Sequence, residues 1–343
     1  MIKTFGMIAA TICLALSFNS LAFAQEAEDV DFAAWDVFLE GVRTEALENG
    51  ISPEIVAAAT KDLLPRRKFI RQDRKQAEFK QTFLNYVKRR VSEARIENGQ
   101  KMMATHAELL ARISLEYDVQ ARYIVAIWGM ETNYGLYPLR ESAIQALATL
   151  AFDKRRQAFF RKELMAALQI LDEGHIDLEN MKGSWAGALG QSQFMPTSFL
   201  GYARDGNGDG RRDIWNTEAD VFASIANYLA EHGWKGDHQW GREVLIPIEL
   251  EAQLVELEAS PPSGCRAFKS HTQKLSLAEW HELGLRRING EALPDRDMQA
   301  SLIRPDGAEG PAFLAYANFK PILSYNCANL YALSVGHLAE EIK

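Results

Sequence analysis

The stretch IVAIWGMETNYG, residues 124–135, decides the fold and places one ionisable group, Glu131, in an apolar run. If this stretch is one helix, Ile127 and Trp128 precede Glu131 by four and three residues and share its face. Gly135 then ends the helix. A carboxyl among apolar neighbours keeps its proton to higher pH, as a general acid requires. The alternative is a glutamate at the wet edge of a buried helix that pairs with an arginine.

Composition and charge restrict the class of protein. The chain has 343 residues, 47% of them apolar and 24% charged, so two or three packed units are expected. Its formal net charge is −8, whereas a nucleic-acid partner requires a clustered basic surface. The KRR runs at 88–90 and 154–156 are too short to provide one and are interpreted as solvated helix faces. The sequence therefore predicts no nucleic-acid partner.

The first 24 residues are predicted to be a signal peptide. Lys3 provides a positive start, MIAATICLALS is a short apolar core, and residues 22–24 (Ala-Phe-Ala) resemble a cleavage site. The apolar core is too short for a comfortable membrane span, which argues against the alternative of an anchoring helix. Cys13 does not lie in a lipoprotein-type box, so no membrane anchor is predicted. Removal of residues 1–24 changes the formal charge from −8 to −9 and implies a periplasmic protein.

The hydrophobic pattern changes along the chain. Residues 33–182 show the three-and-four spacing of amphipathic helices, and EFKQTFLNYVKRRVSEARIENG is expected to be one helical segment that ends at Gly99. Residues 241–320 combine strand-like stretches with turn signals and predict a smaller α/β domain. A helical pattern returns in YNCANLYALSVGHLAEEI. The sequence predicts a mainly α protein with a smaller inserted α/β domain.

The segment GSWAGALGQSQFMPTSF, residues 183–199, has the composition of a binding loop for a neutral ligand. Its glycines permit close backbone approach or positive φ. Gln191, Gln193 and Ser184 offer amide and hydroxyl groups that suit sugars and their acetamido groups. The segment has no lysine or arginine, so it is not expected to bind phosphate. Close helix packing through small residues is the alternative, but it does not explain the glutamines.

The segment DGNGDGRRDIWNTEAD, residues 205–220, resembles a calcium-binding loop. Positions one, three, five and seven are occupied by Asp205, Asn207, Asp209 and, through its backbone carbonyl, Arg211. Position twelve is Asn216 where a glutamate is expected, so the closing carboxylate must come from Glu218 or Asp220. The alternative is a polar turn without a metal.

Cys265 and Cys327 remain after export. In an oxidising compartment two cysteines can form a disulfide, but sequence does not give their separation in space. The sequence leaves both the bonded and the free form open.

Three motifs in this order, GMETNYG, AGALGQSQFMPTSF and an aspartate-rich loop before IANYLAEHGW, are specific together. The chain resembles the B-type lytic murein transglycosylases, glycoside hydrolase family 103, from about residue 33 to its end. The resemblance implies a lysozyme-like helical body with an inserted domain. It also implies cleavage of the β-1,4 bond between N-acetylmuramic acid and N-acetylglucosamine in peptidoglycan, leaving a 1,6-anhydromuramoyl end.

By match to the family motifs, the resemblance implies that Glu131 is the single catalytic acid and base. Substrate contacts are implied for nine residues: Tyr86, Arg155, Arg156, Ser184, Gln193, Tyr228, Tyr325, Asn326 and Tyr331. It implies calcium as a structural, non-catalytic ion, with Asp220 as the closing ligand if one extra residue follows Trp215. That insertion puts the metal site in doubt, and Ala328 departs from a serine that is common in relatives.

The resemblance and the hydrophobic pattern together predict five parts of the chain. These are a signal peptide (1–24), an N-terminal helical region (25–105), a lysozyme-like catalytic core (106–240), a small α/β domain (241–320) and a C-terminal helix (321–343).

The predicted mechanism needs only one carboxyl group. A retaining glycosidase has a second carboxylate about 5–5.5 Å from the first, and no motif places Glu141, Asp153 or Glu173 there. The N-acetyl group of the substrate is therefore expected to act as the nucleophile. The alternatives are a hydrolytic muramidase, a non-catalytic peptidoglycan-binding protein and a calcium-dependent structural protein. The expected partners are glycan strands and enzyme complexes of the cell wall.

Overall fold

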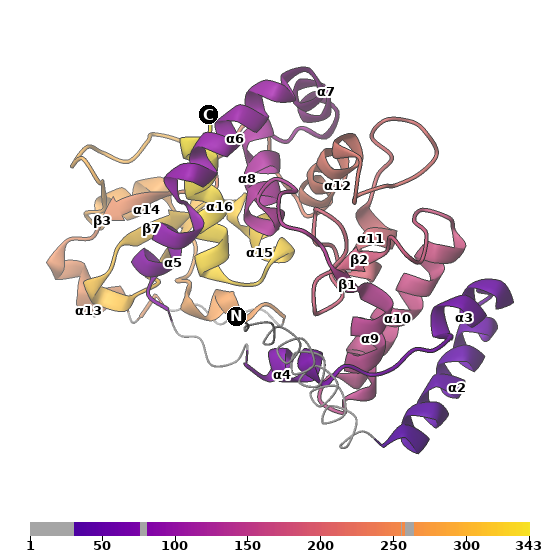
Figure 1. Ribbon diagram of the computed structural model, residues 1–343. Helices are drawn as coiled ribbons and strands as arrows, with labels where there is room; N and C mark the ends of the chain where they lie inside the picture. Colours follow the sequence, from indigo (N-terminus) through magenta and orange to yellow (C-terminus); the bar gives the residue numbers. More distant parts are fainter. Residues whose placement is uncertain (1–30, 76–80, 255, 258–263) are drawn as a thin grey trace, which may run out of the picture. The chain divides into compact units, whose positions relative to one another are not determined.

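The computed structural model describes residues 31–75, 81–254, 256–257 and 264–343 (Figure 1). The predicted signal peptide lies outside the described residues. No helix within those ranges is long and apolar enough to cross a bilayer. The described residues divide into two compact units, the first made of residues 31–75, 140–188 and 195–197 and the second of the described residues within 81–139, 189–194 and 198–343.

The first unit consists of helices and a two-stranded antiparallel ribbon. Its elements are α2 (Phe32–Glu48), α3 (Pro53–Thr60), α4 (Arg67–Lys75), β1 (Glu141–Ser142), α9 (Ala143–Phe152), α10 (Gln157–Asp172) and β2 (Lys182–Gly183). Helix α9 packs along α10, and α3 contacts both α2 and α10 (Figure 1). Trp35 anchors α2, because its ring lies edge-on to Phe152 and its indole N–H donates to the carbonyl of Leu63 (2.8 Å).

One buried helix of the second unit, α8 (Ala121–Thr132), is packed among other helices. The other helices of this unit are α5 (Phe83–Arg90), α6 (Glu93–Thr105), α7 (Ala107–Tyr117), α12 (Glu218–Glu231), α15 (Phe319–Tyr325) and α16 (Asn329–Glu341). A further helix, α11 (Pro196–Tyr202), follows the glycine-rich segment. Helix α8 contacts α6, α7, α12 and α16 (Figure 1). Every residue from Tyr123 to Met130 is buried, as expected for a helix that is apolar on all sides.

A five-stranded antiparallel sheet forms the rest of the second unit. Its strand order is β4-β6-β7-β3-β5, from β3 (Gly241–Leu245), β4 (Leu275–Ser276), β5 (Arg286–Arg287), β6 (Gln299–Ile303) and β7 (Ala312–Ala315). Helix α13 (Glu251–Leu254) and α14 (Leu277–Glu282) accompany the sheet, with short 3₁₀ turns at Ile248–Leu250, Arg266–Ser270 and Gly307–Glu309. Trp280 of α14 is fully buried in this core, and its indole N–H donates to the carbonyl of Ala300 (2.9 Å).

The prediction of a mainly α fold with a smaller α/β part is confirmed. All strands of the five-stranded sheet lie between residues 241 and 315. The predicted boundaries of the five parts of the chain stay a prediction.

The expected helix that ends at Gly99 is wrong in two respects. The segment breaks between α5 and α6, where the Ser92 hydroxyl accepts from the N–H of Arg95 and caps α6. Helix α6 then continues through Gly99 to Thr105. The glycine is needed for close packing, because a Cβ there would lie 2.5 Å from the Tyr134 hydroxyl.

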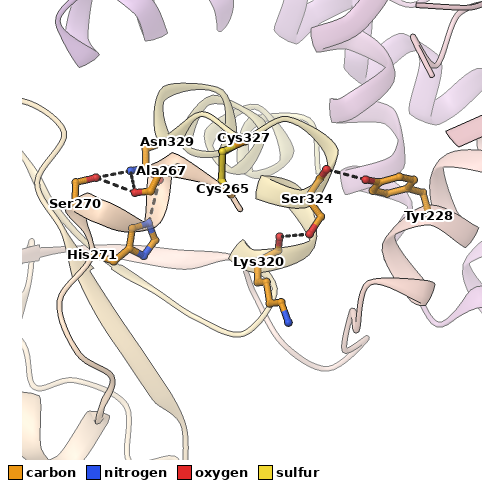
Figure 2. The surroundings of a disulfide bond; sticks show 9 residues. All are labelled: Tyr228, Cys265, Ala267, Ser270, His271, Lys320, Ser324, Cys327 and Asn329. Carbon is orange, nitrogen blue, oxygen red and sulfur yellow. Dashed lines mark hydrogen bonds between the residues drawn. A yellow bond between two sulfur atoms is a disulfide. The ribbon is translucent and has the colours of Figure 1, made fainter. Parts of the chain in front are cut away.

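The C-terminal helical pattern is also two helices, α15 and α16, with residues 326–328 between them. Cys327 in this break is bonded to Cys265, with Cα atoms 5.5 Å apart (Figure 2). The structure thus answers the question that the sequence left open.

Candidate active site

Glu131 lies in the last turn of α8. The helix ends at Thr132 and not at Gly135, because Asn133 adopts the left-handed conformation and its N–H donates to the carbonyl of Gly129. Tyr134 and Gly135 are left-handed as well, with φ of 61° and 74°. Three successive left-handed residues turn the chain sharply just after Glu131, so the acid stands at the end of a helix whose remainder is buried.

Tyr134 fixes this turn against the neighbouring helix. Its hydroxyl donates to the carbonyl of Arg95 (2.8 Å), and its ring lies over Gly129, where a Cβ would be 2.5 Å from a ring carbon. Arg95 itself is buried and donates to Asn133 Oδ1 (3.1 Å), the Tyr137 hydroxyl (3.2 Å) and the carbonyl of Arg90. The end of α8 is therefore held at several points.

The carboxyl of Glu131 is held by a tyrosine from the last helix of the chain. The Tyr331 hydroxyl donates to Glu131 Oε1 at 2.6 Å. Glu131 keeps some contact with solvent, yet protein atoms surround its carboxyl so densely that burial raises its pKa from 4.5 to about 7. The Tyr331 hydrogen bond and the charge of Arg90 act in the opposite direction. A large fraction of Glu131 is therefore protonated at neutral pH, as a general acid requires.

Tyr228 and Tyr325 lie in an aromatic cluster that also contains Phe194. Their rings meet edge to face at 4.9 Å, and Phe194 lies 5.5 and 5.6 Å from them. The Tyr325 hydroxyl donates to the carbonyl of Ser192 (2.6 Å) and the Tyr228 hydroxyl to that of Ser324 (2.7 Å; Figure 2). Burial raises the pKa of Tyr228 to about 12 and holds the pKa of Tyr325 well above its usual range, so both remain hydrogen-bond donors at neutral pH.

The two glutamines of the glycine-rich segment differ in their environment. Gln191 is occupied within the protein: its Oε1 accepts from the Trp128 indole (2.8 Å) and its Nε2 donates to the carbonyl of Trp215 (2.8 Å). Gln193 is left-handed, with φ of 51°, and its Nε2 donates to the carbonyl of Gly190 (2.9 Å). Gln191 is thus a structural residue that braces α8, and Gln193 stays the predicted sugar contact.

Tyr86 and Asn326 belong to the second unit together with Glu131. Tyr86 is half-buried on α5, and its charge interaction with Tyr331 raises the pKa of Tyr331. Asn326 is exposed in the break after α15. The Arg90 guanidinium lies 5.7 Å from the Tyr86 ring centroid. Sequence analysis interpreted the run KRR at 88–90 as a solvated helix face and so missed Arg90. In the structure the positive charge of Arg90 acts on Glu131 and lowers its pKa.

Three of the predicted substrate residues lie in the first unit. The buried carboxylate of Asp73 pairs with Arg155 (2.6 Å) and Arg156 (3.5 Å) at the start of α10. The Ser184 hydroxyl accepts from the N–H groups of Ala186 (3.3 Å) and Ala188 (3.1 Å). Contacts of Arg155, Arg156 and Ser184 with a substrate stay a prediction.

The aspartate-rich loop has the donor chemistry of a calcium site but holds its carboxylates against backbone amides. Asp205 accepts from the N–H groups of Gly208 (2.6 Å) and Gly210 (2.7 Å), and Asp220 from those of Gly206 (2.8 Å) and Asp213 (2.6 Å). Burial raises the pKa of Asp220, and the charges of Asp205 and Asp209 raise it further. This mutual repulsion suits a cation. However, no group of three His, Cys, Asp or Glu side chains in the described ranges is arranged to hold one.

Comparison with known proteins identifies the family of this chain. The family described as "Transglycosylase SLT domain" matches residues 34–340. Membrane-bound lytic murein transglycosylase B of Escherichia coli K12 is 33% identical over 263 residues, which are 76% of this chain and 67% of that protein.

Solved structures extend the likeness to the fold. SltB3 of Pseudomonas aeruginosa, in complex with NAG-NAM-pentapeptide, is 39% identical with a TM-score of 0.83, over 90% of this chain and 79% of that one. The lytic transglycosylase Slt35 of Escherichia coli, in complex with calcium, is 28% identical with a TM-score of 0.73, over 91% and 94%. The resemblance drawn from the motifs is confirmed: this chain belongs to the SLT-domain family of lytic murein transglycosylases.

Proposed function

We propose that this protein cleaves the β-1,4 bond between N-acetylmuramic acid and N-acetylglucosamine in peptidoglycan, with Glu131 as the only catalytic carboxyl group. Family membership supports the reaction, and a related enzyme binds NAG-NAM-pentapeptide. The observation that carries the role of Glu131 is its pKa of about 7, together with its hydrogen bond from Tyr331. Burial keeps the acid protonated near the pH at which it has to donate.

The groups around Glu131 favour a mechanism with one carboxyl group. The groups that act on its pKa are Tyr331 and Arg90, and no carboxylate of the described chain is among them. The other three acids considered from sequence have their own partners in the first unit: Glu141 binds Lys68 (2.9 Å), Asp153 binds Arg74 (3.2 Å) and Glu173 accepts from Gln169 (2.7 Å). None of these acids in the described part of the chain is therefore proposed as the second carboxylate, which a retaining hydrolase uses as its nucleophile.

The proposed reaction has two steps. Protonated Glu131 gives its proton to the glycosidic oxygen as the bond from that oxygen to the anomeric carbon of N-acetylmuramic acid breaks. At the same time the N-acetyl oxygen of the N-acetylmuramic acid attacks its own anomeric carbon. The carboxylate of Glu131 then removes the proton of the C6 hydroxyl. The C6 oxygen displaces the N-acetyl oxygen and closes the 1,6-anhydro ring. The proximity of the C6 hydroxyl allows it to outcompete water.

The remaining predicted residues are proposed to bind the sugar chain. Asn326 would supply a donor near the acetamido group, and Tyr228 and Tyr325 an aromatic surface, with Gln193 beside them. Ser184, Arg155 and Arg156 are proposed as further contacts. Tyr331 has a more direct role, because its hydrogen bond orients the carboxyl that transfers the proton.

We also propose export to the periplasm by cleavage of residues 1–24, and a structural role for calcium. The disulfide between Cys265 and Cys327 supports an oxidising compartment. The carboxylates of Asp205, Asp209 and Asp220 and the carbonyl of Arg211 would hold the ion, with Asn207. A bound calcium ion would neutralise repulsion within the loop and take no part in proton transfer.

Digestion of purified murein sacculi, followed by mass spectrometry of the products, tests the proposal. Anhydro ends are expected, and they should disappear with Glu131→Gln. Ends heavier by one water molecule would identify a muramidase instead. Binding to sacculi without any cleavage would identify a non-catalytic wall protein.

A further inference from the structure

The disulfide joins the sheet part of the second unit to the segment that carries two active-site tyrosines. Cys265 precedes the 3₁₀ turn Arg266–Ser270, and Cys327 lies two residues after Tyr325 and four before Tyr331. The bond closes a loop across 62 residues of sequence. The short connection between α15 and α16 is thus tied covalently at its middle.

Asn329 makes a second, independent tie between the same two segments (Figure 2). Its Nδ2 donates to the carbonyl of Ala267 (3.0 Å) and to the Ser270 hydroxyl (2.7 Å), and its Oδ1 lies 3.0 Å from His271 Nε2. His271 Nδ1 lies 3.0 Å from the Ser301 hydroxyl of β6. Burial lowers the pKa of His271, so the ring is neutral, donates from Nε2 to Asn329 and accepts at Nδ1 from Ser301.

The two tyrosines on either side of this connection each make one hydroxyl hydrogen bond in the site. The Tyr331 hydroxyl donates to Glu131, and the Tyr325 hydroxyl donates to the carbonyl of Ser192. A small displacement of the connection would lengthen both hydrogen bonds, because each depends on the position of one hydroxyl group. Two partners of Asn329, Ser270 and His271, also line a hollow of about 180 Å³.

We propose that the Cys265–Cys327 disulfide and Asn329 are positioning residues that hold Tyr325 and Tyr331 in place for catalysis by Glu131. The proposal rests on the proposed function. Neither cysteine is placed at the reacting atoms, and their effect is transmitted through the two tyrosines. Because the bond can be broken by reduction, the same device makes the activity depend on the redox state of the compartment.

The disulfide is accessible enough for this to be tested in the folded protein. Cys327 is exposed and Cys265 is half-buried. A dithiol reductant attacks one sulfur as thiolate, and a second exchange closes the reductant into a ring disulfide. Two electrons and two protons pass from the dithiol to the protein, which then holds two thiols.

The first experiment compares kcat and KM on a soluble murein glycan before and after reduction by a dithiol, at a temperature well below unfolding of either form. We expect kcat to fall roughly tenfold, because the Tyr331 hydroxyl no longer orients the carboxyl of Glu131, and KM to rise less, through the displacement of Tyr325. The variant Cys265→Ala/Cys327→Ala should show the same loss and no response to the dithiol, which controls for effects of the reagent elsewhere.

The second experiment needs no activity and measures the pKa of Glu131 by NMR titration of its ¹³C-labelled carboxyl. Tyr331, Tyr325, Tyr86 and Arg90 are the charged or titratable groups that interact with Glu131 or with Tyr331. We expect reduction to raise the pKa, because α16 remains packed on α8 while the Tyr331 hydrogen bond weakens. Asn329→Ala should raise it in the same direction, and reduction should have no further effect in Tyr331→Phe.

The two experiments separate the proposals. If reduction lowers the melting temperature but leaves kcat and the pKa of Glu131 unchanged, the disulfide only stabilises the fold and the positioning role is wrong. If the oxidised protein does not cleave murein, the proposed function fails, and the NMR titration still decides whether the disulfide positions Tyr331.

Discussion

Within the second unit, the carboxyl group of Glu131 and the carboxylates of the aspartate-rich loop lie in opposite environments. Glu131 has one hydrogen bond donor and dense protein surroundings, and its pKa rises to about 7. Asp209 in the aspartate-rich loop is exposed, and its hydrogen bonds from Asn207 and from the N–H of Arg211 lower its pKa. The same chemical group is thus prepared to release a proton in one place and to remain an anion in the other.

Asp220 lies between these extremes. It is fully buried, as Glu131 largely is, but two backbone N–H groups point at its carboxylate and oppose the effect of burial. The difference shows that burial alone does not make a general acid. The density of protein around the carboxyl and the donors that satisfy its charged form together decide whether it keeps its proton.

The largest effect is expected for Glu131→Gln, which keeps the shape of the side chain and removes the proton that is transferred. Because general acid catalysis contributes about 10²- to 10⁴-fold, kcat on murein glycan should fall by that order. Asp209→Asn makes the same chemical change in an exposed side chain and is the comparison variant. Substantial turnover by Glu131→Gln would show that another group donates the proton.

The same variant should be more stable than the wild type at alkaline pH. The pKa of Glu131 is raised in the folded state, so its stabilising contribution is complete below about pH 4.5 and is lost as pH rises through about 7. The difference amounts to up to about 3 kcal/mol at pH 8, an upper figure because the carboxyl keeps some contact with solvent.

Urea unfolding of both proteins between pH 4 and pH 8 measures this difference. The variant should gain on the wild type between about pH 4.5 and pH 7 and level off above that, with Glu249→Gln on the exposed surface as the control for loss of one carboxylate. Two parallel stability curves would contradict a raised pKa for Glu131.

Tyr331→Phe should have a smaller effect with a distinct signature. It keeps the buried ring and removes the hydrogen bond to Glu131, which is worth about 1.5–3 kcal/mol when one partner is charged. The pKa of Glu131 should therefore rise, and the alkaline limb of the kcat profile, where the acid loses its proton, should move to higher pH. A limb that does not move would show that Tyr331 does not act on the charged form.

Much of the Glu131 environment could be predicted from sequence, because the apolar run and the helical period place Ile127 and Trp128 beside it. The contact with Tyr331 could not, since it joins residues 200 positions apart and no local pattern encodes it. Arg90 escaped notice for a related reason. A charge at the end of a basic run has the same local sequence whether it faces solvent or a site on another helix.

Glycines and cysteines show the same limit. Gly99 was taken as a helix end because glycine often ends helices, but the hydroxyl of Tyr134, in the turn after α8, leaves no room for a Cβ there. The pairing of Cys265 with Cys327 depends on a Cα separation that only the folded chain defines. In both cases the sequence identifies the residue type, but not the distant residue that it contacts in the fold.

The smallest effect is expected from calcium, which would act only on the aspartate-rich loop and not on Glu131. Millimolar calcium should raise the melting temperature by about 2 °C, since a tenfold excess over Kd stabilises by about 1.4 kcal/mol. Asp209→Asn should abolish the rise by removing a charged donor, whereas Glu249→Gln should retain it. Magnesium should have less effect, because it requires a tighter octahedral site than this lengthened loop offers. The pKa of Glu131 should be the same with and without calcium. An unchanged melting temperature would instead mean that the backbone amides already satisfy these carboxylates and that the loop is a polar turn without a metal.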